Sequence, residues 1–343
     1  MAVRMGIHAG LDRVEDPAER LDELANVREF ERVARSVLDP VRYERVAGGA
    51  RDERTVRENE RGFARIGLVP RVLRGVREPA LGVDLLGTRG SWPVVIAPTA
   101  CHGLAHPDAE RATARAAAAT GTIMIAAAAS TVAIEDIAAE ARTVAPDPAL
   151  WFQLCPQPDH GPAEAAVRRA EDAGVRAFVL TVDADAAPGL SWRHVDRLRG
   201  ATGLPIVLKG ILHPDDARLG VEHGADGLIV SNHGGRGLDA APPTIDRLPP
   251  LADAVAGRIP LLLGGGVRRG TDVVKALALG ASAVAVGRPV VWGLATAGDA
   301  GVRRVLDLLR TEVAHTMILC GCPDVRAVPH DLAVPGAIGT APS

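Results

Sequence analysis

The residues best suited to chemistry lie in the segment 231–236 (SNHGGR), which directly follows the apolar run 227–230. Histidine exchanges a proton near neutral pH, so His233 is a candidate base. Arg236, three residues later, offers a planar fork of donors that matches a carboxylate. The two glycines between them let the backbone bend tightly and let a flat ligand approach closely. A base and an anion clamp at one strand end indicate chemistry on a small acid.

Polar side chains also end other apolar runs of the chain. Lys209 directly follows the run 205–208, whereas the run 177–182 contains Thr181 and is followed by Asp183. Enzymes built on parallel barrels place their active sites at the C-terminal ends of the strands. We therefore expect these side chains to meet the candidate base at one end of the fold.

Glycine-rich turns with an arginine follow the last two apolar runs, at 264–268 (GGGVR) and 287–288 (GR). Exposed backbone N–H groups and guanidinium groups bind anions, so these turns predict a phosphate site. The sequence thus predicts a phosphorylated ligand with its tail at these turns. The reactive end of that ligand should face Lys209 and His233.

The elements that must position these residues form a repeating pattern. Eight short apolar runs alternate with segments of helical spacing, as a (β/α)8 TIM barrel requires. The alternative is a doubly wound open sheet, but the glycine fingerprint of that fold does not follow the first strand. We predict an α/β fold, a TIM barrel with an N-terminal helical extension. The predicted strands are 93–99, 122–127, 150–154, 177–182, 205–208, 227–230, 259–263 and 283–286, and the predicted helices include 109–119, 164–173, 214–223 and 270–279.

Length and composition exclude several classes of protein. The 343 residues are 47% hydrophobic and 24% charged, which suffices for one large core. A formal net charge of −3 with scattered basic residues argues against nucleic acid or an anionic membrane as a partner. The four cysteines match neither a secreted disulfide framework nor a zinc site, and we predict no metal site. Without a membrane-spanning run or a signal-peptide pattern, the predicted location is cytoplasmic.

The chain carries a series of motifs whose order is specific. They are 98–100 (PTA), 106–107 (HP), 180–183 (LTVD), 205–211 (PIVLKGI), 231–239 (SNHGGRGLD), 265–272 (GGVRRGTD) and 286–292 (VGRPVVW). With these motifs the chain resembles the FMN-dependent 2-hydroxy acid oxidase and dehydrogenase family, which includes glycolate oxidase, lactate oxidase and mandelate dehydrogenase. The resemblance predicts an N-terminal extension at 1–27, the barrel at 28–325 and a C-terminal tail at 326–343.

The resemblance implies an FMN site and a reaction, the oxidation of a 2-hydroxy acid to a 2-oxo acid. It implies His233 as the general base and Asp183 as the group that orients its imidazole. Lys209 would stabilise negative charge near N1 of the flavin, and Arg236 would bind the substrate carboxylate. The residues implied to line the flavin ring are Pro98, Thr99, Ala100, Gln153, Thr181 and Ser231. Those implied to hold the phosphate are Gly265, Gly266, Arg268, Gly287 and Arg288.

The chain departs from the family pattern mainly on the substrate side. Alignment of the motifs puts Arg45 and Gln157 where the family has two active-site tyrosines, and we predict that both contact the substrate. Seven residues, 184–190, stand after Asp183 where the family has a long loop. These changes predict an open site and a larger or more anionic substrate than glycolate. Other replaced positions are Ala127 and Gly264, which predict weaker retention of FMN, and Ala129, where the family has a bulky aromatic.

Three hypotheses of different classes follow. The first is an FMN enzyme of specialised metabolism that oxidises a 2-hydroxy acid, with Ala100 favouring oxygen as electron acceptor and a homotetramer as the assembly. The second is a flavoenzyme of the same fold with altered chemistry, such as oxidative decarboxylation or a substrate without a free carboxylate. The third is a non-catalytic flavin-binding barrel. Binding of FMN and its reduction by hydroxy acids distinguish the three.

Overall fold

The computed structural model describes residues 21–155, 160–183 and 190–336 of the chain. Its central strands are β4 (Val94–Ile96), β5 (Ile123–Ala127), β6 (Leu150–Leu154), β7 (Phe178–Thr181), β8 (Ile206–Ile211), β9 (Gly227–Val230), β10 (Leu261–Gly264) and β11 (Ala283–Val286). They are parallel and close into a barrel in the order β10-β11-β4-β5-β6-β7-β8-β9. The predicted TIM barrel is therefore confirmed, with a strand at each of the eight predicted runs.

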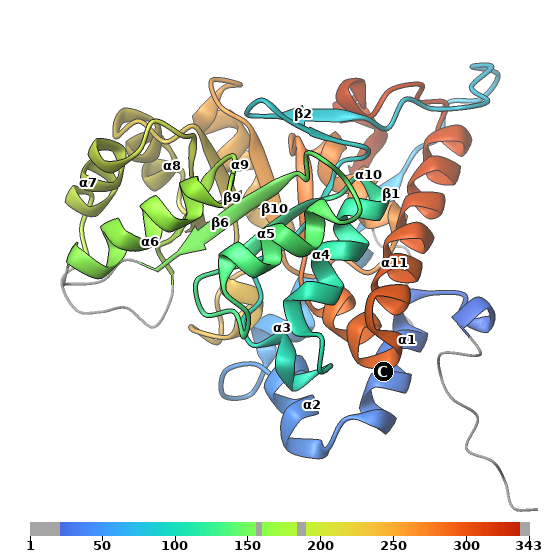
Figure 1. Ribbon diagram of the computed structural model, residues 1–343. Helices are drawn as coiled ribbons and strands as arrows, with labels where there is room; N and C mark the ends of the chain where they lie inside the picture. Colours follow the sequence, from blue (N-terminus) through green and yellow to red (C-terminus); the bar gives the residue numbers. More distant parts are fainter. Residues whose placement is uncertain (1–20, 156–159, 184–189, 337–343) are drawn as a thin grey trace, which may run out of the picture.

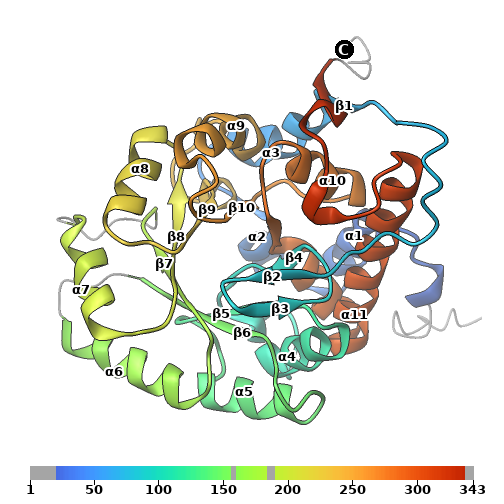
Figure 2. The same cartoon turned by 90° about the horizontal axis from the view of Figure 1, so that it is seen from above.

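Helices form a ring outside the barrel, as Figure 2 shows in the view along its axis. They are α4 (Ala109–Thr120), α5 (Ile134–Arg142), α6 (His160–Asp172), α7 (Arg193–Ala201), α8 (Pro214–Glu222), α9 (Thr244–Val255), α10 (Gly270–Ala278) and α11 (Arg288–Leu319). The strands are buried on both faces, by the helices outside and by side chains filling the barrel within. All three residues of β4 are fully buried, which explains the continuous apolar runs.

Two further pieces close the ends of the barrel (Figure 1). At the carboxyl end of the strands lie α2 (Pro40–Ala47) and α3 (Arg54–Ala64), while α1 (Val27–Val37) packs against α11. At the opposite end lies the hairpin of β2 (Val83–Leu85) and β3 (Thr88–Gly90). The hairpin is anchored by Trp151, whose indole N–H donates to Oγ1 of Thr88 at 2.9 Å. Helices α1 to α3 begin only where the extension predicted at 1–27 ends and lie within the range predicted as barrel, and α2 and α3 cover the end where active sites of such barrels lie.

Part of the predicted tail is ordered and packed. The chain beyond α11 forms the short 3-10 helices η4 (Val325–Ala327) and η5 (His330–Leu332) and then β12 (Ala333–Pro335), which pairs antiparallel with β1 (Ile66–Leu68). Val325, Leu332 and Ala333 are buried, so these residues belong to the folded body rather than to a loose tail. The sequence after residue 325 is rich in proline, alanine and glycine, which is typical of a tail and gave no sign of the pairing with β1. No helix in the described ranges is long and apolar enough to cross a membrane.

Candidate active site

A cavity of about 280 Å³ opens at the carboxyl ends of β4 and of β8 to β11. Its volume lies near the lower end of the range for small-molecule sites. The turns after these strands and the last turn of α2 form its wall. The predicted site residues that line it are Arg45, Pro98, Thr99, Ala100, Lys209, Ser231, His233, Arg236, Gly265, Gly266, Arg268, Gly287 and Arg288. The fold thus brings together most of the residues that the sequence analysis assigned to one site.

His233, Asp183 and Lys209 form a compact polar group beside this cavity. Nδ1 of His233 lies 2.9 Å from Oδ1 of Asp183, and Nζ of Lys209 lies 3.6 Å from the same oxygen. A carboxylate only accepts hydrogen bonds, so the imidazole carries its proton on Nδ1 and donates it. Nζ of Lys209 also lies 3.4 Å from Nδ1, which is a contact between two donors. In the neutral imidazole with this tautomer, Nε2 carries no proton and can accept one from a ligand.

Burial and mutual charge set the ionisation of this group. Burial alone would raise the pKa of Asp183, but the hydrogen bond with His233 and the charge of Lys209 outweigh it and hold the pKa below its usual value. Burial lowers the pKa of Lys209, although the charge of Asp183 opposes that shift. Asp183 therefore stays a carboxylate and can stabilise the imidazolium that forms when His233 takes a proton.

A bulge in β8 makes room for Asp183. The pairing of β8 with β9 shifts between Lys209 and Ile211, and Gly210 between them has a φ of +113°. A Cβ on Gly210 would lie 2.4 Å from Cβ of Asp183, so a side chain at this position would displace the carboxylate. The role of Gly210 was not predicted from the sequence. Its signal was a glycine inside an apolar strand, which often marks a bulge or a close approach.

The turn that carries the candidate base is left-handed. The φ angles are +57° for His233, +65° for Gly234 and +75° for Gly235, which together form the 3-10 turn η3 (His233–Gly235). A left-handed histidine costs about 1–3 kcal/mol and persists only where its surroundings impose it. The glycines are required by packing: a Cβ on Gly235 would lie 2.8 Å from the backbone nitrogen of Val56. The N-terminal helix α3 thus presses directly on the turn that holds the base.

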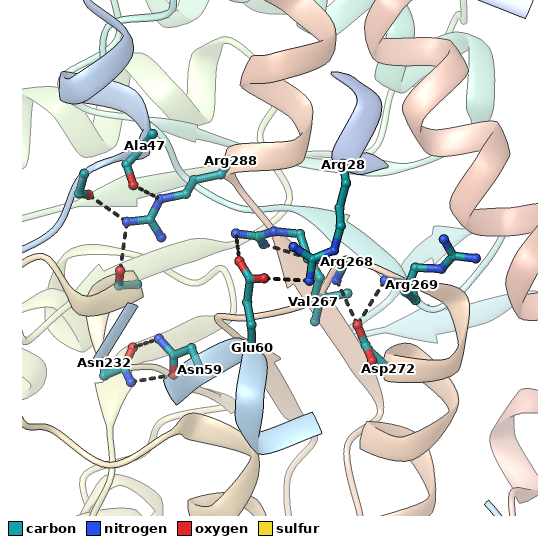
Figure 3. Close-up of polar contacts among 12 residues, drawn as sticks. Arg28, Ala47, Asn59, Glu60, Asn232, Val267, Arg268, Arg269, Asp272 and Arg288 are labelled. Atoms are coloured by element: carbon teal, nitrogen blue, oxygen red, sulfur yellow. Dashed lines mark hydrogen bonds and ion pairs between the residues drawn. The ribbon is translucent and has the colours of Figure 1, made fainter. Parts of the chain in front are cut away.

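Arg288 ties this turn to the end of α2 (Figure 3). Its Nε donates to the carbonyl of Ala47 at 3.0 Å, and its Nη2 donates to the carbonyls of Gly48 and Gly234 at 2.8 and 2.9 Å. Carbonyls at a helix C-terminus lack partners and favour a cation. Burial, together with the charges of neighbouring arginines, lowers the pKa of Arg288 to about 10. It is a largely buried cation without a carboxylate ion pair among the described residues.

Arg236 contacts the same helix end. Its Nη2 donates to the carbonyl of Arg45 at 2.9 Å, and its Nη1 donates to the carbonyl of Gly48 at 3.1 Å. Arg236, the residue predicted to bind a carboxylate, therefore lines the cavity, but its Nη1 and Nη2 atoms already donate to backbone carbonyls. A substrate carboxylate would have to exchange for these carbonyls or bind another edge of the group.

Arg268 is held by residues that the sequence analysis did not identify. Its Nη2 lies 2.9 Å from Oε1 of Glu60 on α3, and Oε2 of the same carboxylate lies 2.9 Å from Arg28 (Figure 3). The guanidinium lies 4.8 Å above the ring of Trp292. Its Nε is buried with no hydrogen-bond partner among the described residues. An anion in the cavity would supply that partner.

A reciprocal pair of amides joins α3 to the turn after β9. Nδ2 of Asn59 donates to Oδ1 of Asn232 at 2.9 Å, and Nδ2 of Asn232 donates back at 2.8 Å (Figure 3). Both side chains are buried. A single sequence gives no sign that two asparagines 173 positions apart will meet, so the sequence analysis missed the pair.

His102 lies behind Thr99 and outside the cavity. Its Nε2 forms a short hydrogen bond with Oγ1 of Thr99, and its Nδ1 lies 2.9 Å from Oγ1 of Thr113. Burial lowers the pKa of His102, although the charge of Glu110 opposes this, so the imidazole stays neutral. It fixes the hydroxyl of a residue predicted to face the flavin.

Three predicted residues, Asp183, Gln153 and Thr181, adjoin the cavity without lining it. Asp183 acts through His233, while Gln153 donates to Oγ1 of Thr181 at 2.9 Å and to Sγ of Cys155 at 3.1 Å. Gln157 and most of the segment 184–190 lie outside the described residues. The ring of Tyr43 packs under Arg35 instead of lining the cavity, so it does not replace the missing tyrosines.

The donors of the cavity fit the FMN that the resemblance implies. Arg268 and Arg288 are largely buried cations, and the unpartnered Nε of Arg268 suits a phosphate. Gly265 and Gly266, which precede Arg268 in the chain, have φ angles of +113° and +81° and both line the cavity. Lys209 lies at the other side, where it could face the flavin ring. Among the described residues, no group of three His, Cys, Asp or Glu side chains could hold a metal ion.

Comparison with known proteins agrees with this geometry. The model of the FMN-dependent dehydrogenase family matches residues 34–189 and 185–334, two segments that overlap at residues 185–189. A peroxisomal (S)-2-hydroxyacid oxidase of Arabidopsis thaliana is 42% identical over 90% of this chain and 96% of its own length. Glycolate oxidase 1 of Oryza sativa subsp. indica is 42% identical over 90% and 95%. A crystal structure of mandelate oxidase superposes with a TM-score of 0.87 at 39% identity, covering 92% of this chain and all of that one. The chain therefore belongs to the FMN-dependent dehydrogenase family.

Proposed function

We propose that this protein binds FMN and oxidises a 2-hydroxy acid to a 2-oxo acid. The observation that carries the proposal is the hydrogen bond of 2.9 Å between Nδ1 of His233 and Asp183. It fixes the imidazole with Nε2 free beside a cavity that also holds Lys209 and arginines. Relatives with printed names such as (S)-2-hydroxyacid oxidase and glycolate oxidase support the same reaction.

In this proposal, Nε2 of His233 accepts the proton of the substrate hydroxyl. Asp183 holds the imidazole and stabilises its cationic form, since its low pKa keeps it charged. Arg236 binds the substrate carboxylate and so orients the reacting carbon toward the cofactor. The oxidation removes two electrons and two protons from the hydroxy acid. FMN, when bound, accepts the two electrons at its ring system.

The residues proposed to hold FMN divide into two groups. Arg268 and Arg288 bind the phosphate, with the glycine turns at 265–266 and 287 beside them. Lys209 supplies a positive charge against the ring. The proposed ring-lining residues are Pro98, Thr99, Ala100, Gln153, Thr181 and Ser231, of which Gln153 and Thr181 act from just behind the cavity wall.

We propose oxygen as the acceptor that regenerates FMN, since Ala100 lies in the cavity wall and the named relatives are oxidases. A cytoplasmic location and a homotetramer stay predictions, and the relative from Arabidopsis thaliana carries the word peroxisomal in its name. Specialised metabolism likewise stays a prediction. Cell fractionation and the solution mass measure the first two directly.

The test is product formation by the purified chain loaded with FMN. With a panel of (S)- and (R)-2-hydroxy acids in air, we expect one 2-oxo acid and one hydrogen peroxide per oxygen consumed. Oxygen uptake without a 2-oxo acid would contradict the reaction. Formation of 2-oxo acid only with an artificial electron acceptor would contradict oxygen as the acceptor while retaining the oxidation.

One observation favours a second candidate, a substrate without a free carboxylate. The guanidinium of Arg236 already donates to the carbonyls of Arg45 and Gly48. A mandelate oxidase variant has been crystallised with 2-hydroxy-phenylacetamide, an amide. Turnover of 2-hydroxy amides or esters faster than the parent acids would select this candidate over the first.

A further inference from the structure

One cation of the cavity is predicted to contact the substrate, but the proposed reaction does not yet use it. Arg45, in the last turn of α2, lines the cavity beside Arg236. Its side chain is exposed and forms no ion pair or hydrogen bond with any described residue. The nearby acidic side chain of Glu53 is used elsewhere, since its Oε1 accepts from the backbone N–H of Gly49 at 2.7 Å.

The other cations of the cavity are accounted for by the proposed function. Arg288 and Arg268, which also pairs with Glu60, are proposed to bind the phosphate, and Lys209 pairs with Asp183. Arg236 is proposed to bind one substrate carboxylate. Arg45 is needed neither for the cofactor nor for a single carboxylate in this proposal.

The position of Arg45 is built into the fold. Arg236 donates to the backbone carbonyl of Arg45 at 2.9 Å, and Arg288 donates to the carbonyls of Ala47 and Gly48, at the helix end that follows. The guanidinium groups of Arg236 and Arg288 therefore both bind backbone carbonyls of residues 45–48, the segment that carries Arg45. Burial lowers the pKa of Arg236, and the charge of Arg45 lowers it further. An anion bound between Arg236 and Arg45 would offset the repulsion between their positive charges.

We propose that Arg45 binds a second anionic group of the substrate, so that the substrate class is 2-hydroxy acids with an additional carboxylate. This inference rests on the proposed function and makes it specific. Arg236 takes the carboxylate next to the reacting carbon, and Arg45 takes the distal one. A guanidinium suits the role because its planar fork pairs with a carboxylate through two hydrogen bonds.

The test compares acids that differ only in the distal carboxylate. Malate is paired with 2-hydroxybutyrate, and 2-hydroxyglutarate with 2-hydroxypentanoate, each as both enantiomers, in anaerobic mixing with the FMN-loaded protein. We expect kcat/KM for flavin reduction to be about tenfold higher for at least one dicarboxylate than for its partner, the gain of one charge-assisted contact. Binding of the matching 2-oxo acids, followed by the change of the flavin spectrum, should show the same preference.

Variants assign the preference to one side chain. Arg45→Gln should lower turnover of the dicarboxylate far more than turnover of its monocarboxylate partner and so abolish the preference, and Arg45→Lys should keep part of the preference. Arg42→Gln is the matched control, because Arg42 is on the same helix, pairs with Asp39 and does not line the cavity. It should change neither series.

Three results would overturn the inference. The first is equal turnover of both series by the wild-type protein, which leaves the proposed function intact. The second is an equal loss for both series in Arg45→Gln. The third is a flavin that no acid reduces, in which case the proposed function fails and the inference falls with it.

Discussion

The two sides of the barrel mouth differ in how firmly they are built. On the side of β8 to β11, the turns that carry the candidate base and the arginines are all bound to the N-terminal helices. Asn232 pairs with Asn59, Arg288 with the end of α2, and Arg268 with Glu60. On the side of β5 to β7, small residues such as Ala127 and Ala129 stand at the strand ends, and Gln153 contacts Thr181 and Cys155, two neighbours on the same side.

The difference between the two sides indicates which features of the family this chain retains. The β8 to β11 side holds the groups that we propose for the phosphate, the flavin charge and the proton, and these groups lie in the family motifs. One tyrosine, an aromatic and a long loop of the family pattern are replaced in the segments that follow β5 to β7, whereas Arg45 on α2 and Gly264 at the end of β10 are replacements on the other side. Asp183 is the exception, since it follows β7 but reaches His233 on the other side. We infer that the cofactor chemistry is retained and that the substrate has changed.

The largest expected effect is that of His233→Asn. Loss of the base should slow flavin reduction about 10²- to 10⁴-fold while FMN binding persists. Asparagine tolerates the left-handed backbone that His233 adopts, so the turn should keep its shape. Rapid anaerobic mixing measures the rate, and fluorescence quenching measures the binding. A rate within tenfold of the wild type would show that proton transfer does not depend on this side of the mouth.

Arg288→Gln tests whether this side recognises the phosphate. Loss of one charge-assisted contact of about 1.5–3 kcal/mol should weaken FMN binding about 10- to 100-fold. Riboflavin, which lacks the phosphate, serves as the control ligand and should lose far less affinity. Isothermal titration with both ligands gives the two changes. An equal loss for both would mean that Arg288 acts only by holding α2.

Gly210→Ala tests the link between the two sides. A Cβ there would lie 2.4 Å from Asp183, and the φ of +113° strains any other residue. We expect a loss of about 1–3 kcal/mol in the free energy of unfolding, and slower flavin reduction because Asp183 moves away from His233. The matched control is Gly200→Ala in α7, where no atom lies within 4 Å of the new Cβ. It should raise stability by less than about 1 kcal/mol. Similar losses in both variants would contradict this link.

The smallest expected effect is a pH-dependent change in Asp183→Asn. The pKa of Asp183 is lowered in the folded state, so its charge contributes stability above the usual carboxyl pKa of about 3.9. That contribution is lost as the pH falls through the folded pKa. The variant should be less stable than the wild type by about 1–2 kcal/mol at pH 7, and the difference should shrink below about pH 4. Urea unfolding at several pH values measures it. A difference that is constant with pH would show that the charge of Asp183 is not involved.

Local patterns in the sequence were sufficient for the barrel and for most of the site. Apolar runs of strand length specify buried parallel strands, and the residues that follow them lie at the carboxyl ends by topology alone. The proximity of His233, Arg236 and Lys209 could therefore be predicted from the sequence alone. What such patterns cannot show is contact between distant segments.

The contacts that were missed are of this long-range kind. Glu60 and Asn59 are polar residues of an ordinary amphipathic helix, and only the packing of α3 on the barrel gives them partners more than 170 positions away. The pairing of β12 with β1 likewise joins segments more than 260 positions apart, residues 66–68 and 333–335. Gly210 is different, because a glycine inside a strand was visible in the sequence and was not interpreted.

The most direct test of the central claim is the visible spectrum of the FMN-loaded protein during anaerobic mixing with 2-hydroxy acids. If the β8 to β11 side retains the family chemistry, the oxidised flavin band should bleach with at least one acid, and one 2-oxo acid should form per flavin. A flavin that is bound but is bleached by no acid would contradict retained chemistry. A protein that takes up no FMN would contradict the cofactor site itself.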